Sequence, residues 1–352
     1  MATSLFFLGF LILNYAVLYG VSTFFNLPRT NTLYILILIV TLSYPISSSL
    51  ERMFSNISSR IFYSISAAWF GISIYIIILL VLYSIFILLI SFLIKISTLI
   101  IGELLIIIAV LVSIYAIINA TRMEVKEINV HIDGIKNDIK AVQLSDVHIG
   151  PIRNLGFIKM IVNKTNKLEP DIIFITGDLF DGTSKIHKDI PKALNRFNAP
   201  TLFVTGNHDV YQGLSEVSKI LGKTKVKTLT NEVFHFKDLQ IIGVDYSSEK
   251  RYLEKILQDI EFDRNKPTIL LYHLPREFQT TKDAGIQLQL SGHTHNGQFF
   301  PINYMVKTIF PYIKGLYDYQ GAHLYVSQGT GTWGPPMRLG SRCEITLIKI
   351  KK

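Results

Sequence analysis

Hydrophobic residues follow two different patterns along this chain, and the change between them falls near residue 120. Before that point, long apolar runs contain no charged side chain, and after it, short apolar runs alternate with polar segments. The uncharged runs cover residues 5–25, 33–50, 61–94 and 104–120. Because about 20 apolar residues of helix cross a bilayer core, we predict that residues 1–120 form an all-helical membrane region with about four transmembrane helices.

Two of these runs allow more than one interpretation. As a helix, the run 61–94 would be about 51 Å long, so we interpret it as one long or tilted span. The run 5–25 has a cleaved export signal as its alternative. It lacks the basic start and small-residue cleavage site of such a signal, which favours a retained anchor.

Residues 121–352 have the pattern of an α/β domain. Strand-like runs, apolar or β-branched, cover residues 141–144, 172–176, 201–205, 268–272 and 286–290. Apolar residues at helical spacing occur in 155–168, 190–197 and 252–260. This alternation predicts an α/β fold, in which a ligand site lies beyond the carboxyl ends of the strands.

Charge separates the same two regions. The first 120 residues carry four basic and two acidic side chains, and the remainder carries 31 and 24. The basic excess of the second region suits an anionic substrate or an anionic lipid surface, although a merely solvated surface explains it equally well. The single cysteine, Cys343, excludes an intrachain disulfide.

The flanks of the apolar runs bear on orientation. With four spans, both ends of the membrane region lie on one side of the bilayer. The basic residues on that side outnumber those on the other by four to two, namely Arg52, Arg60, Arg122 and Lys126 against Arg29 and Lys95. The positive-inside rule therefore favours an integral, multi-pass protein of the cell membrane with a cytoplasmic second region.

Metal-binding residue types follow most of the predicted strands. They are Asp146, His148, Asp178, Asn207, His273, His293 and His295. We expect Asp146 and His148, separated by one residue, to point to the same side of an extended strand end. Taken singly, Asp146-x-His148 and Gly177-Asp178 are also compatible with ordinary turns.

The block Gly206-Asn207-His208-Asp209 is more informative. It places an amide oxygen, an imidazole and a carboxylate in succession, and a carboxylate can fix the tautomer of a histidine that acts as a general acid beside a metal. We therefore predict His208 and Asp209 as catalytic residues.

The mixture of imidazole, carboxylate and amide donors suits Mn²⁺, with Zn²⁺ or Fe as alternatives, better than Mg²⁺ or Ca²⁺ alone. Two divalent cations about 3.5–4 Å apart can hold a phosphate ester and activate a bridging hydroxide for in-line attack. The seven ligands suffice for two sites if Asp178 bridges the ions. We expect no cofactor beyond these metals.

In their order along the chain, these blocks resemble the calcineurin-like metallophosphoesterase superfamily, and the tail 325–347 resembles its membrane-associated YkuE-like branch. The resemblance implies a four-layer α/β/β/α sandwich over residues 121–352 as the catalytic domain. It also implies that Asp146, His148, Asp178 and His295 hold one metal, and that Asp178, Asn207, His273 and His293 hold the other.

By the same resemblance, His208 contacts the substrate phosphate and protonates the leaving oxygen, and Asp209 orients His208. The sequence departs from the branch at Asn296, where glycine is usual. It also departs in its four predicted spans, because many relatives have a cleavable signal or one short anchor.

The leading hypothesis is an enzyme, a two-metal hydrolase of a phosphate ester or pyrophosphate on a small molecule, a lipid or a lipid-linked substrate. The segment 299–312 is rich in aromatic and apolar residues, which favours contact with membrane lipids, and its alternative is a loop folded on the domain's own core. A nuclease or cyclic-nucleotide phosphodiesterase ranks second, because no clustered basic stripe tracks a nucleic acid backbone. A catalytically silent membrane receptor or scaffold ranks last. The sequence indicates no protein partner.

Overall fold

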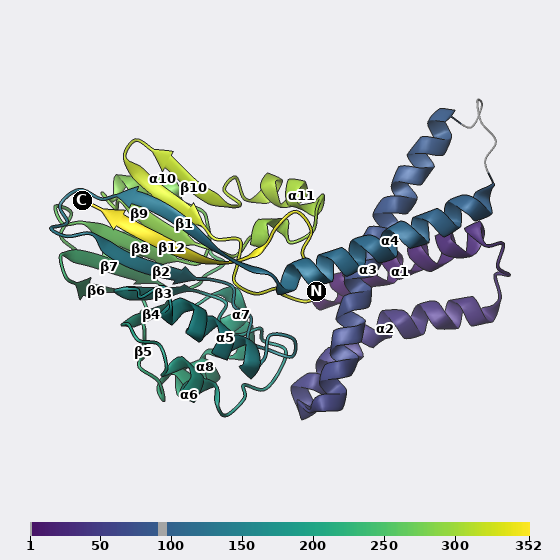
Figure 1. Cartoon of the computed structure of the whole chain (residues 1–352), viewed down its shortest axis with the longest axis horizontal. Coiled ribbons are helices and arrows are strands. Elements are labelled where there is room, and N and C mark those ends of the chain that lie inside the picture. Colours follow the sequence, from purple (N-terminus) through teal and green to yellow (C-terminus); the bar gives the residue numbers. More distant parts are fainter. Residues whose placement is uncertain (1, 91–96) are drawn as a thin grey trace. The chain divides into compact units, whose positions relative to one another are not determined.

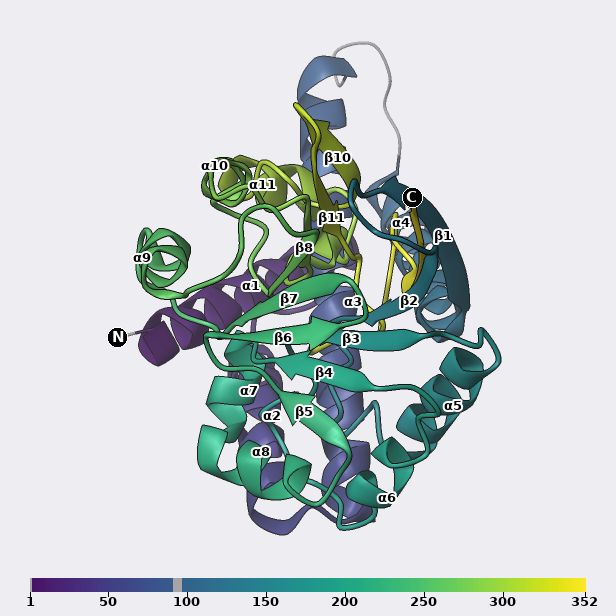
Figure 2. The ribbon, with the colours of Figure 1, turned by 90° about the vertical axis from the view of Figure 1, so that its left-hand side faces the viewer.

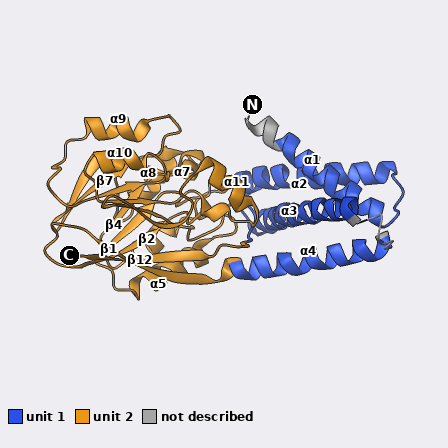
Figure 3. Ribbon diagram, turned by 90° about the horizontal axis from the view of Figure 1, so that it is seen from above, with its two compact units in different colours: residues 1–119, 334–337 blue, residues 120–333, 338–352 orange. Residues whose placement is uncertain are grey.

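The computed structural model describes residues 2–90 and 97–352. Its chain divides into two compact units, one made of residues 1–119 with 334–337 and the other of residues 120–333 with 338–352 (Figure 3).

Four long helices make up most of the first unit. They are α1 (Ala2–Phe24), α2 (Asn31–Phe54), α3 (Ile57–Ile90) and α4 (Thr98–Thr121), the last of which runs into the second unit (Figure 1). All four are long and apolar enough to cross a membrane. Residues 91–94 of the predicted third run lie outside the described residues.

Two six-stranded sheets form the centre of the second unit. The first has the order β1 (Met123–His131), β12 (Cys343–Lys351), β2 (Ile139–Leu144), β3 (Ile172–Thr176), β4 (Thr201–Val204) and β5 (Val226–Thr228). The second has the order β10 (Gly315–Tyr319), β11 (Ala322–Val326), β9 (Leu288–Ser291), β8 (Thr268–Tyr272), β7 (Leu239–Val244) and β6 (Glu232–Phe236). The strands β2 to β5 are mutually parallel, and so are β7, β8, β9 and β11.

Side chains along the central strands point alternately to the two faces of each sheet, and their packing on both faces produces a four-layer sandwich. In β3, Ile172 and Phe174 belong to the apolar cluster between the two sheets. Ile173 and Ile175 point the other way, into the cluster under the helices on the outer face of the first sheet. Since both faces of β3 are covered, its sequence is a continuous apolar run.

Helices cover both outer faces of this sandwich (Figure 2). The first sheet is covered by α5 (Leu155–Asn166), α6 (Ile190–Leu194) and α8 (Leu214–Leu221). The second is covered by α9 (Tyr252–Asp259) and α10 (Phe278–Asp283). The predicted α/β/β/α architecture, preceded by an all-helical apolar region, is confirmed.

The predicted strands and helices all occur, β3 and β8 with the predicted ends and the others with shifted ends. The run 201–205 ends one residue earlier in β4, the run 286–290 begins later as β9, and the helix predicted over 155–168 ends at Asn166. The prediction omitted β1, β5, β6, β7, β10, β11 and β12, together with four short helices, α7 (Asn207–Gln212), α8, α10 and α11 (Ile302–Ile309).

Candidate metal centre

The predicted ligands all follow the carboxyl ends of parallel strands. Asp146 and His148 follow β2, Asp178 follows β3, and Asn207 begins α7 just after β4. From the second sheet, His273 follows β8, and the pair His293 and His295 follows β9. Because these strands run parallel and the sheets are stacked, their carboxyl ends bring side chains that are far apart in sequence to one place.

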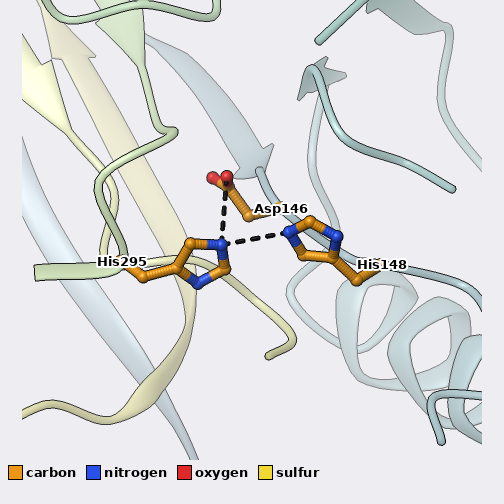
Figure 4. Close-up of side chains that lie close together, drawn as sticks. All are labelled: Asp146, His148 and His295. Carbon is orange, nitrogen blue, oxygen red and sulfur yellow. Dashed lines mark hydrogen bonds and ion pairs between the residues drawn. The ribbon is translucent and has the colours of Figure 1, made fainter. Parts of the chain in front are cut away.

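Three side chains that can donate to a metal form one group at these strand ends, namely Asp146, His148 and His295. The Nε2 atoms of His148 and His295 are 3.0 Å apart, and Nε2 of His295 is 3.4 Å from Oδ1 of Asp146 (Figure 4). All three residues are buried. Two imidazole nitrogens and a carboxylate oxygen that converge in a buried space make up the donor set of a divalent cation.

A second group lies on the His273 side. Nε2 of His273 is 3.3 Å from Oδ2 of Asp178, 3.2 Å from Nδ1 of His293 and 3.3 Å from Oδ1 of Asn207. The carboxylate of Asp178 also lies 3.8 Å from Nε2 of His148. Asp178 is therefore next to both groups, and the structure brings all seven predicted ligands together.

The backbone of these ligands differs from the prediction. Asp146 and His148 have φ values of 52°, so they occupy left-handed turns, and the extended strand end expected for them is wrong. The strand β2 stops at Leu144. The N–H groups of Asp146 and His148 then donate to the carbonyls of Gly177 and Asp178, each at 3.0 Å.

Two glycines allow these turns to approach one another. A Cβ on Gly206 would collide with the backbone nitrogen and carboxylate of Asp178, and one on Gly292 would collide with the side chains of Ser145 and Asp146. Both positions therefore require glycine, because any larger residue would prevent this close contact.

The donor set and its position on the sheets correspond to a known family. The sequence profile described as Calcineurin-like phosphoesterase matches residues 139–297. An uncharacterized metallophosphoesterase of Bacillus subtilis, YkuE, is 31% identical over 235 residues, which cover 60% of this chain and 79% of that protein. The chain belongs to the calcineurin-like phosphoesterase family.

Two other relatives of this family are longer than the matched part. An uncharacterized metallophosphoesterase of Helicobacter pylori strain J99 is 35% identical over 65% of this chain and 64% of its own length. A Bos taurus protein named transmembrane protein with metallophosphoesterase domain is 37% identical over 67% of this chain and 59% of its own length. The chain thus spans less than two thirds of the length of either protein.

Neighbouring groups orient the rings of this metallophosphoesterase site. Nδ1 of His273 donates to the carbonyl of Thr176 at 2.9 Å, and Nδ1 of His148 lies 3.4 Å from Oδ1 of the buried Asp181. Such partners fix which nitrogen of each ring faces a metal. Asp181 was absent from the predicted site, although its place three residues after Asp178 was a signal for it.

Arg338 is a second residue that the sequence did not indicate. Its guanidinium is buried, lies 3.1 Å from Nδ1 of His295, and donates to the carbonyls of Gln328 and Gly331, each at 2.7 Å. Burial, and then the charges of His148 and Arg338, hold the pKa of His295 well below its usual range. His295 therefore stays neutral, which is the form that binds metals.

Asp178 and His273 form a strongly coupled pair. Burial opposes their charges, but His273 holds the pKa of Asp178 well below its ordinary value, and Asp178 raises the pKa of His273 to about 9. Burial and the charge of His273 lower the pKa of His293 to about 3. The group without metal therefore carries a protonated His273 beside a neutral His293.

The contacts of His208 and Asp209 differ from those predicted. Nδ1 of His208 donates to the carbonyl of Asp181 at 2.8 Å. The buried carboxylate of Asp209 instead accepts the N–H groups of Gly206 at 2.8 Å and Phe180 at 3.0 Å. The ring of His208 is thus held by the carbonyl of Asp181, and the carboxylate of Asp209 holds the turn on which His208 lies.

Aromatic rings surround the histidines of the site. Tyr211 and Trp333 contact the ring of His208, with centroids 5.2 and 6.4 Å away. Tyr246 lies 6.3 Å from His273, and Phe310 lies 5.1 Å from His293. Tyr211 is 56% exposed and Trp333 is 39% exposed, so both can contact a substrate.

Asn296 has a left-handed backbone with a φ of 50°. This conformation explains why glycine suits the position, and asparagine is among the residues that tolerate it best. The Asn296 amide donates to Gln328 and to the carbonyl of Gly340, each at 3.2 Å. Its side chain therefore tethers neighbouring loops.

Proposed function

We propose that this chain is a multi-pass membrane protein that hydrolyses phosphate esters at a two-metal centre. The observation that carries the proposal is the convergence of two groups of buried or partly buried donors on the single carboxylate of Asp178. In this proposal Asp146, His148 and His295 complete one metal site with Asp178. Asn207, His273 and His293 complete the other.

The residues fit divalent cations by their chemistry. Four imidazoles, two carboxylates and one amide oxygen suit Mn²⁺, Zn²⁺ or Fe. When bound, two such cations would offset the charge of a phosphate group and lower the pKa of a water molecule. The buried surroundings would strengthen both effects, because charges interact more strongly away from bulk water.

His208 is the proposed general acid. It is partly buried, its ring centroid lies 4.6 Å from that of His148, and its backbone N–H donates to Asp178 at 2.8 Å. Since Nδ1 donates to the carbonyl of Asp181, Nε2 is the nitrogen left to pass a proton to the leaving oxygen. Asp209 supports this role by fixing the turn.

The proposed substrate is a phosphate ester or pyrophosphate presented at a membrane, including lipid-linked ones. Four helices able to cross a bilayer keep the chain at lipid head groups, and the basic excess of residues 121–352 suits an anionic substrate. A cyclic-nucleotide phosphodiesterase is the second candidate. The exposed rings of Tyr211 and Trp333 favour it, since aromatic side chains stack on bases.

The test uses full-length protein purified in detergent. Asp178→Asn should abolish hydrolysis and lower the metal content of both sites, as measured by mass spectrometry of bound metals. His208→Ala should lower kcat about 100- to 10,000-fold and leave the metal content intact. Asp259→Asn and His235→Ala, both exposed, are matched controls that should retain activity and metals.

Two results would contradict parts of this proposal. Full activity of His208→Ala would remove His208 from the mechanism, and unchanged metal content in Asp178→Asn would exclude a shared carboxylate. A panel of lipid phosphates in vesicles, nucleotides, cyclic nucleotides and simple monoesters would separate the substrate classes. Much faster hydrolysis of a soluble ester than of any lipid phosphate would exclude a lipid substrate.

A further inference from the structure

The helix α11 belongs to the second unit (Figure 1), and it exposes apolar side chains. None of its residues is buried. Tyr304, Met305 and Ile309 are 64%, 67% and 68% exposed, and Phe300, just before the helix, is 48% exposed. Met305 and Ile309 are four residues apart and share one face. These four residues are called the α11 face below.

Position and charge indicate what this face contacts. Between residues 299 and 317 the sequence has no acidic residue, and it carries Lys307 and Lys314, both exposed. Aromatic and apolar side chains combined with lysine are typical of helices that lie in the interface of a membrane. An anionic leaflet attracts such lysines.

The chain also provides the surface that such a helix needs. Its four apolar helices are long and apolar enough to cross a membrane, so in the multi-pass protein proposed above a bilayer is always next to the chain. We propose that the α11 face binds the anionic surface of this bilayer, with Lys307 and Lys314 near the lipid phosphates. This binding is independent of the proposed hydrolysis.

Contacts at both ends of α11 link it to the metal centre. Asn303 packs so closely on Gly297 that a Cβ there would collide with it, and Gly297 ends the short turn that begins at His295. At the other end, the ring of Phe310 lies 5.1 Å from that of His293. A bilayer bound to α11 would therefore lie close to the mouth of the site.

The test places an environment-sensitive fluorophore on the α11 face of the full chain. Met305→Cys and Ile309→Cys are labelled separately and compared with Gln258→Cys, an exposed position on the acidic helix α9. The parent chain sets the background of labelling, because its only cysteine, Cys343, is buried. Each protein is reconstituted into vesicles of equal parts phosphatidylcholine and phosphatidylglycerol.

Labels at 305 and 309 should shift to shorter wavelength, be quenched by spin-labelled lipids and be protected from iodide, unlike the label at 258. Lys307→Glu, or vesicles of phosphatidylcholine alone, should reduce the lipid quenching. Equal iodide access at 305, 309 and 258 without lipid quenching would overturn the proposal. Protection from iodide without lipid quenching would also overturn it, in favour of a protein surface such as a second copy of the chain.

Discussion

Five of the seven proposed ligands have a left-handed backbone, namely Asp146, His148, Asp178, His293 and His295. Each such residue costs on the order of 1–2 kcal/mol relative to the right-handed region. Surrounding hydrogen bonds maintain these conformations, as the bonds from the N–H groups of Asp146 and His148 to the turn after β3 do. These hydrogen bonds between separate turns hold the proposed ligands close together.

The raised pKa of His273 leads to a prediction about pH. A protonated His273 stabilises the fold without metal, and this contribution is fully present below about 6.5 and is lost as the pH rises through about 9. A cation binds only the neutral ring of His273. Metal affinity therefore increases with pH, whereas the contribution of His273 to the stability of the metal-free fold decreases. Affinity for Mn²⁺ should rise about tenfold per pH unit until about pH 9.

Isothermal titration calorimetry with Mn²⁺, in buffers of different ionisation enthalpy, measures this proton release. Roughly one proton should leave His273 when the site that contains it binds metal at neutral pH, and the release should fade above about pH 9. His208→Ala should retain the same pH dependence, since His208 is not a proposed ligand. An affinity that stays constant across neutral pH would contradict the assignment of His273.

At the scale of elements, one carboxylate joins the two sheets beside the site. Glu344 of β12 is buried and accepts hydrogen bonds from the hydroxyl of Tyr325 of β11 at 2.9 Å and from the backbone and side chain of Gln328 at 3.1 and 3.0 Å. The carbonyl of Gln328 in turn accepts from Arg338, which contacts His295. The sheet junction is therefore connected to the metal centre.

Tyr325→Phe tests this junction, because it removes the hydroxyl without leaving a cavity. The loss of one hydrogen bond to a buried carboxylate should lower the free energy of unfolding by about 1–2 kcal/mol, seen as a lower midpoint of thermal unfolding. Tyr304→Phe, on the exposed α11 face, should leave the midpoint unchanged. Equal midpoints for the two variants would show that Glu344 does not depend on Tyr325.

For the whole molecule, we propose the boundary predicted from the sequence, with a membrane region of residues 1–120 and a catalytic domain of residues 121–352. The second unit has apolar clusters of its own on both faces of each sheet. Hydrogen bonds cross this boundary at Ala120, whose carbonyl accepts from the buried Arg153 at 2.7 Å and from the thiol of Cys343 at 3.3 Å.

Fragments of the chain test this boundary. Both 121–352 and 119–352 should be soluble and folded and should bind metals, as judged by circular dichroism and metal analysis. The longer fragment should be more stable by about 1 kcal/mol, because it keeps the acceptor for Arg153. Insoluble protein or loss of metals in both fragments would mean that the helices complete the catalytic fold.

Much of this architecture could be predicted from local sequence. Strands covered on both faces, such as β3 and β8, are continuous apolar runs, and the long uncharged runs mark α1 to α4. Edge strands such as β10, with exposed and polar positions, have no such local signal. Their conformation depends on neighbours that are distant in sequence, such as the pairing of β1 with β12.

The sequence by itself determined which residues form the candidate metal centre, because donors directly after apolar strands must meet at the carboxyl edge of the sheets. Tertiary structure alone decided how they are held. It places Arg338 against His295, 43 positions away in the sequence. It directs the carboxylate of Asp209 to the backbone N–H groups of Gly206 and Phe180. It also gives Asp146 and His148 their left-handed backbone conformations. Hydrogen bonds between distant segments produce these features, and no local pattern of residues encodes them.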